Sequence, residues 1–219
     1  KKWIFMSKIV TDLSKMIFWI SPVQINYCTP SSAYTDLNQH EKDRDHPHAF
    51  YDHGYFFEEE RKGLILDGDW DIAQLKFSSL LEYKALDRHI KGIERWGLSK
   101  FAGRIAAYMN MSNKKSAGAQ YRFKGFNNPD EFTISRECQI NSLIKSIKRD
   151  GMFPAGGKNC QVSGLDDISV NVSRTGGLIF NNRGHHRLAI AKILDIDLIP
   201  VQIIVWHADN FIEESKINT

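Results

Sequence analysis

The fold of this chain is decided by residues 180–206, which read FNNRGHHRLAIAKILDIDLIPVQIIVW. A β-rich run ends at Phe180, and a second apolar run with the composition of a strand covers 199–205. Between the two runs, apolar residues repeat at the spacing of one helix face: Ala189, Ile190, Ile193 and Leu194. The stretch therefore predicts a strand, a helix that begins near Gly184, and a closing strand.

The first turn of this predicted helix is rich in positive and titratable side chains: Arg183, His185, His186 and Arg187. A helix N-terminus already carries a partial positive charge and free N–H donors. Each cation placed there costs on the order of 0.3–1 kcal/mol unless an anion compensates for it. Phosphate is the commonest anion at such a position, so the pattern predicts a phosphate site at 183–187. The alternative is pairing with carboxylates such as Asp195 and Asp197.

The composition is typical of a globular protein, and the 219 residues are enough for one large domain. The formal net charge of +3 is too small to indicate nucleic-acid binding. Three distant cysteines without a C-x-x-C motif favour reduced thiols and a cytoplasmic location. Charged residues interrupt the apolar stretch 3–20, so no uninterrupted apolar run there is long enough to span a membrane. Its apolar residues repeat at helical spacing, so we expect an amphipathic helix and no membrane partner.

The rest of the chain alternates helix and strand patterns. The periodicity predicts helices over 76–91, 98–110 and 130–150, the last with Asp130 as its N-cap. Strands are expected at 23–27 and 63–66, and a β-hairpin is expected from 168–172, a turn at 173–176, and 177–180.

The succession of helix, β-hairpin, Gly-x-His-Arg, helix and Ile-Pro-Val strand resembles the ParB/sulfiredoxin-like superfamily over about 137–206. The residues that carry the resemblance are Gly184, His186, Arg187, Ala189, Ala191, Lys192, Ile199, Pro200 and Val201. The resemblance implies an α+β fold with a small mixed sheet and helices. The ParB/sulfiredoxin-like core would occupy 129–212. An N-terminal helical extension at 1–128, which could supply a first strand of the core, would complete one compact unit.

Members of this superfamily bind CTP and DNA, repair cysteine sulfinic acid with ATP, or phosphorylate free serine. They share a nucleotide phosphate held at the loop that corresponds to 183–187. His185 stands where sulfiredoxins carry their catalytic Cys, and Arg183 stands where free serine kinases carry an Asp. His185 and His186 replace the Glu-Arg of partition proteins, and little chain follows 205 for a helix-turn-helix. The resemblance thus implies a bound nucleotide. The departures at these positions disfavour the three activities.

A second candidate feature is the acidic turn Asp67-Gly68-Asp69-Trp70-Asp71. In an extended segment, Asp67, Asp69 and Asp71 would share one side and could hold Mg²⁺ opposite the phosphates. The alternative is a turn whose Asp caps the next helix, with Trp70 as a buried anchor or a base-stacking ring.

Together these features predict a protein that binds a nucleoside di- or triphosphate (ATP, ADP or CTP) with Mg²⁺. Gly184 would let the backbone approach the phosphates, which would contact Arg183, His185, His186 and Arg187. The chemistry expected is phosphoryl transfer to a small-molecule acceptor or nucleotide hydrolysis, with three candidate catalytic groups: His186, Asp69 and Asp67. The alternative function is a non-catalytic, nucleotide-gated or DNA-associated binding module.

Three minor features favour structural interpretations. His46, His48 and His53 have zinc-ligand side chains, but their polar surroundings indicate a solvated loop. The aromatic and basic stretch 121–126 is expected to pack on the core rather than on single-stranded nucleic acid. Lys192 is expected to be solvated. The chain has no P-loop, Gly-x-Gly-x-x-Gly, Gly-x-Ser-x-Gly or His-Glu-x-x-His motif.

Overall fold

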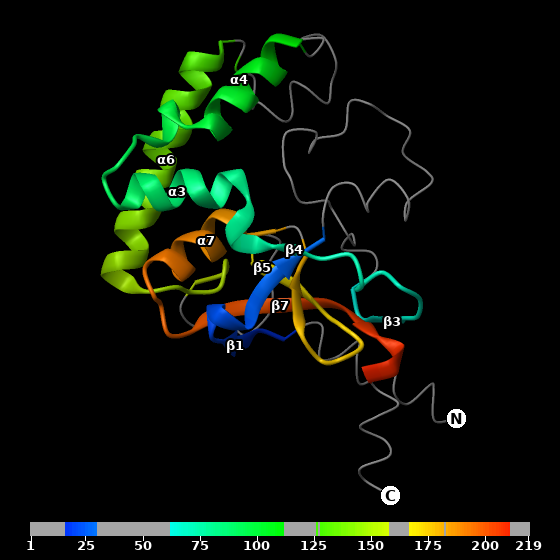
Figure 1. Cartoon of the computed structure of the whole chain (residues 1–219). Coiled ribbons are helices and arrows are strands. Elements are labelled where there is room, and N and C mark those ends of the chain that lie inside the picture. Colours follow the sequence, from blue (N-terminus) through cyan, green and yellow to red (C-terminus); the bar gives the residue numbers. More distant parts are fainter. Residues whose placement is uncertain are drawn as a thin grey trace, which may run out of the picture.

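A computed structural model of the chain describes residues 16–29, 62–111, 126, 128–157, 167–181 and 183–210. They form one mixed seven-stranded sheet with helices, which confirms the predicted α+β class (Figure 1). The strands are β1 (Phe18–Ile20), β2 (Ile25–Cys28), β3 (Leu64–Leu66), β4 (Leu75–Lys76), β5 (Ile168–Val172), β6 (Leu178–Phe180) and β7 (Ile199–His207). The α-helices are α3 (Leu81–Ile90), α4 (Lys100–Met111), α6 (Pro129–Asp150) and α7 (His185–Ile193).

The sheet has the order β1-β7-β5-β6-β2-β4, and β3 also pairs with β7. Strands β5 and β6 form the predicted antiparallel hairpin, and β7 lies parallel to β5. Helix α7 follows β6 in the chain and leads to β7, as the pattern of 180–206 predicts. The N-terminal strands join the same sheet: β2 is parallel to β6, and β1 pairs with the beginning of β7.

The helices cover one face of this sheet, with α7 lying between the strands and the other helices (Figure 1). Helix α7 contacts β5, α3 and α6. Side chains alternate along β5, so Ile168, Val170 and Val172 enter the core under the helices. The intervening Ser169 and Asn171 are buried as well. The closing strand β7 is buried along its whole length, which makes it the centre of the fold.

Two sequence-based expectations differ from the structure. The helix expected over 3–20 is wrong at its end, because 18–20 form the strand β1; residues 1–15 lie outside the described part. Antiparallel pairing of Phe18 with Val201 satisfies the backbone there, and helical periodicity over so short a run is a weak signal. The N-cap of α6 is Asn128, whose side chain accepts a hydrogen bond from the Asp130 N–H at 2.8 Å.

Three further segments agree with expectation in kind. Helices α3, α4 and α6 fall within a few residues of the predicted ranges, and a short 3₁₀ turn at Phe77–Ser79 occupies the start of the first of them. A second 3₁₀ turn, Pro22–Gln24, precedes β2, and a third, Trp96–Leu98, precedes α4. Among the described residues, no helix combines the length and the apolar character needed to cross a membrane.

Candidate functional site at the start of helix α7

Gly184 fixes where α7 begins. It is the N-cap and has a left-handed backbone with φ of 77°. A Cβ at this position would lie 2.7 Å from Ile168 Cγ1 and 2.8 Å from Ile168 Cα. Glycine is therefore required both by its conformation and by the close approach of the loop to β5. The packing explains this residue without any ligand.

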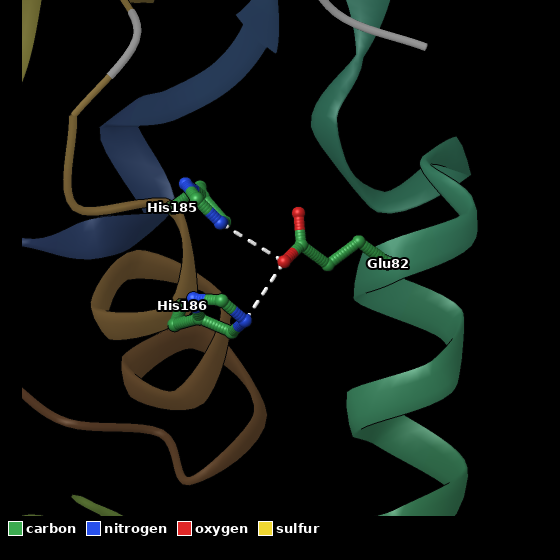
Figure 2. A group of neighbouring side chains, drawn as sticks. All are labelled: Glu82, His185 and His186. Atoms are coloured by element: carbon green, nitrogen blue, oxygen red, sulfur yellow. Dashed lines mark ion pairs between the residues drawn. The ribbon is translucent and has the colours of Figure 1, made fainter. Parts of the chain in front are cut away.

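Three polar side chains meet at the first turn of α7 (Figure 2). His185 and His186 extend from α7 toward Glu82, which reaches across from the first turn of α3. The Nε2 atoms of both imidazoles lie 2.9 Å from the same carboxylate oxygen, Glu82 Oε1. The two imidazole rings are adjacent, with centroids 4.3 Å apart. Two neighbouring residues of one helix thus converge on a single oxygen of another helix.

Burial sets the charge of this cluster. The Glu82 side chain is 5% exposed, and those of His185 and His186 are 19% and 14% exposed. Desolvation lowers the pKa of His186 to about 4, although the neighbouring Glu82 carboxylate opposes that shift. Desolvation alone would raise the pKa of Glu82, but the two imidazoles outweigh it and hold this pKa well below its ordinary value. An anionic carboxylate therefore lies beside a neutral imidazole at pH 7.

The hydrogen-bond geometry of the cluster is poor despite its short distances. Within the described residues, Glu82 Oε1 and His186 Nε2 are buried atoms that make no hydrogen bond. The ligand atoms of Glu82, His185 and His186 all lie within 4.8 Å of one another, so these residues have the donor set and spacing to hold a metal ion. A buried carboxylate oxygen without a hydrogen bond is costly, and such an atom calls for a compensating cation or donor.

Arg187 is directed toward protein groups. Its guanidinium donates to the Phe153 carbonyl and lies 3.5 Å from Asp167 Oδ1. Asp167 is fully buried and also accepts a hydrogen bond from the Ala155 N–H at 2.7 Å. Arg187 thus ties α7 to the segment that follows α6. Its predicted contact with phosphate stays a prediction.

Arg183 immediately precedes the helix. Its backbone N–H donates to Ser169 Oγ at 2.9 Å, which holds the loop against β5. Lys192, at the other end of α7, donates to the Pro22 carbonyl at 2.6 Å, and burial lowers its pKa to about 8. The expectation that Lys192 is solvated is therefore wrong.

The acidic turn at 67–71 faces a different part of the sheet. The buried carboxylate of Asp71 accepts hydrogen bonds from the backbone N–H and the guanidinium of Arg174, at 2.7–3.1 Å. Asp69, whose side chain is 80% exposed, contacts the same guanidinium at 2.9 Å, while Asp67 accepts from the Gly68 N–H. Trp70 is a buried anchor that packs against Ile179, Ile204 and Val205.

The two candidate regions lie at opposite ends of β5. Arg174 follows the last residue of β5, whereas Gly184 packs on Ile168, the first residue of that strand. The structure therefore does not bring the acidic turn together with the 183–187 loop. This geometry does not support the two roles predicted for the acidic turn. Metal binding by Asp67, Asp69 and Asp71 stays a prediction, as does catalysis by Asp67 and Asp69.

Sequence reasoning missed Glu82, which lies in no motif. One signal was present: Glu82 shares a helix face with Ala85 and Leu86, both buried. A carboxylate on the apolar face of a helix indicates a buried partner. The histidines at 46, 48 and 53 and the stretch 121–125 lie outside the described residues. Phe126 packs against Phe132 with ring centroids 5.9 Å apart.

No family model matches this chain, and neither a curated protein nor a solved structure does. The resemblance to the ParB/sulfiredoxin-like superfamily thus continues to rest on Gly184, His186, Arg187 and the order of the elements around them.

Proposed function

We propose that the protein binds a phosphorylated ligand at the first turn of α7, and that a nucleoside di- or triphosphate is the first candidate. One observation carries the proposal. The N-cap of α7 is Gly184, so no side chain accepts a hydrogen bond from the N–H groups of the first turn, and that turn contains no acidic residue. The N–H groups of such a turn are suited to phosphate oxygens, and the helix dipole favours the negative charge. The ParB/sulfiredoxin-like resemblance points to the same turn.

The structure reassigns the positive groups of this turn. Asp167 compensates Arg187, and Glu82 lies against both imidazoles. Carboxylates of the protein itself therefore pair with part of the positive charge that the sequence places at 183–187. Arg183 is the arginine of the loop whose backbone is anchored on Ser169. We assign the phosphate to the helix N–H groups and to the Arg183 guanidinium, because Arg183 directly precedes the N-cap of α7. Arg187 is given a positioning role.

Phosphoryl transfer or hydrolysis would require a base or an activated nucleophile at this turn. Glu82 is the carboxylate next to the proposed phosphate position, but its lowered pKa makes it a weak base at pH 7. The lowered pKa of His186 has the same consequence. The lowered pKa of both groups favours a second candidate function: a binding module that responds to the nucleotide without consuming it.

Binding is tested by thermal unfolding of the full chain with ATP, ADP, CTP or GTP and Mg²⁺. A ligand that binds only the folded state must raise the midpoint. We expect at least one nucleotide to raise the midpoint. Arg183→Gln should then weaken the binding of that nucleotide about tenfold, which corresponds to the loss of one charge-assisted hydrogen bond. Lys145→Gln removes an exposed charge from α6 and serves as the control. If no nucleotide raises the midpoint, or if both variants behave alike, the assignment is wrong.

Turnover is then measured on the nucleotide that binds. Release of phosphate, or its transfer to a metabolite in a mixed pool, would support phosphoryl chemistry. Saturated binding without any product would support the binding module.

A further inference from the structure

We infer that Glu82, His185 and His186 form a binding site for one divalent transition-metal ion of the Zn²⁺, Co²⁺ or Fe²⁺ class. This inference concerns the imidazole and carboxylate atoms of the cluster. It does not depend on the proposed nucleotide, which is assigned to the backbone N–H groups and Arg183.

The three donor atoms converge at nearly the spacing of ligands around one ion. Imidazole nitrogen and carboxylate oxygen bind zinc at about 2.0–2.2 Å, so two ligands of a tetrahedral ion lie roughly 3.3 Å apart. Each Nε2 lies 2.9 Å from Glu82 Oε1, and no pair of the three ligand atoms is separated by more than 4.8 Å. Small side-chain rotations would bring all three separations to the spacing that a bound ion requires.

Hydrogen bonding does not account for the contact between His186 and Glu82. A neutral imidazole that served Glu82 would direct an N–H at an oxygen lone pair. Within the described part of the chain, however, His186 Nε2 and Glu82 Oε1 make no hydrogen bond although they are 2.9 Å apart and buried. Figure 2 shows both imidazoles converging on the same carboxylate oxygen, so the three donor atoms lie around one small region, as the ligands of one ion do. A dication there would compensate the buried carboxylate.

The chemistry of the donors selects the class of ion. Mg²⁺ and Ca²⁺ prefer oxygen ligands, whereas imidazole suits zinc, iron and other first-row ions. Two histidines and one carboxylate leave coordination positions open, an arrangement that resembles catalytic rather than structural zinc sites and the facial triads of non-haem iron. Both imidazole side chains are partly exposed, whereas the donor atoms Glu82 Oε1 and His186 Nε2 are buried. This donor set differs from the oxygen-only set at Asp67, Asp69 and Asp71.

The test is titration of the EDTA-treated, dialysed full chain with Zn²⁺ and Co²⁺, followed by calorimetry and elemental analysis. We expect one equivalent per chain with micromolar or tighter affinity. Glu82→Gln and His186→Gln should each weaken binding at least tenfold. Asp69→Asn alters the sequence-predicted metal set on an exposed side chain and should bind as the wild type does. All titrations are run without nucleotide, so their outcome is independent of the proposed function.

Three results would overturn the site: no stoichiometric ion, unchanged affinity in both cluster variants, or a loss confined to Asp69→Asn. Circular dichroism checks that each variant is folded. If the cluster variants do not fold, imidazole NMR of the wild-type chain decides the question. Added Zn²⁺ should then perturb the ring signals of His185 and His186, and perturbation of other histidines alone would contradict the assignment.

Discussion

At the scale of single residues, Gly184 shows how a motif position can have a structural cause. The Gly of Gly-x-His-Arg suggested close approach of a phosphate. In the structure, it is the backbone of Ile168 that approaches, and the positive φ adds a second requirement. Glu82 shows the reverse case. It belongs to no motif, yet it is the anion closest to the imidazoles of His185 and His186.

Gly184→Ala should lower the free energy of unfolding by about 3 kcal/mol, because an L-residue is strained in the left-handed region and its Cβ would overlap Ile168. Gly92→Ala is a matched control, since Gly92 has a φ of 69° and nothing within 4 Å of the added Cβ. Gly92→Ala should lower the free energy of unfolding by only about 1 kcal/mol, because it adds the left-handed backbone strain without a steric contact. Urea unfolding of both variants measures the difference, and equal losses would show that the contact with Ile168 carries no cost.

At the scale of elements, the acidic turn links the turn between β5 and β6 to the end of β7. Asp71 binds Arg174 in the turn that joins β5 and β6, and the Gly68 carbonyl lies 2.7 Å from His207 Nε2 at the end of β7. These contacts satisfy buried polar groups without a ligand. The structural alternative for the Asp-rich turn accounts for the arrangement that is observed.

Asp71→Asn should lower the free energy of unfolding by about 2 kcal/mol at pH 7, because a buried, charge-assisted pair with Arg174 is lost. Asp69→Asn, at an exposed position on the same guanidinium, should change it by less than about 0.5 kcal/mol. Chemical denaturation of both variants gives the comparison. If the two substitutions lower the free energy of unfolding equally, the burial of Asp71 does not strengthen its pair with Arg174.

The same pair predicts a pH dependence. Burial would raise the pKa of Asp71, but the hydrogen bonds from Arg174 outweigh it and lower this pKa. The unfolded state therefore binds the proton more readily than the folded state, and the stabilisation present at neutral pH is lost as the pH falls below about 4 through the folded pKa. The stability difference between wild type and Asp71→Asn should shrink in that range. A constant difference would contradict the assignment.

At the scale of the whole molecule, the predictable features are the local ones. The hairpin, α7 and β7 were predictable because turn residues and apolar periodicity specify them within short windows. The strand β1 was not, because its conformation is set by pairing with a segment far along the chain. The meeting of Glu82 with His185 and His186 depends on how α3 packs on α7, which no local pattern encodes.

The separation of the two sequence-predicted regions also belongs to this scale. The strand β5 lies between the acidic turn at 67–71 and the loop at 183–187, so the tertiary fold divides what the sequence suggested as one site. The carboxylate that the fold supplies to the two histidines of α7 comes from α3 instead. We therefore place the proposed functional centre at the first turn of α7 with Glu82.

The most direct test of that centre is a crystal structure with Zn²⁺ and the best-binding nucleotide, with the metal located by anomalous scattering. We expect an anomalous peak within bonding distance of Glu82, His185 and His186, and phosphate oxygens at the N-terminus of α7. A metal peak at Asp67–Asp71, or a nucleotide bound away from α7, would contradict it.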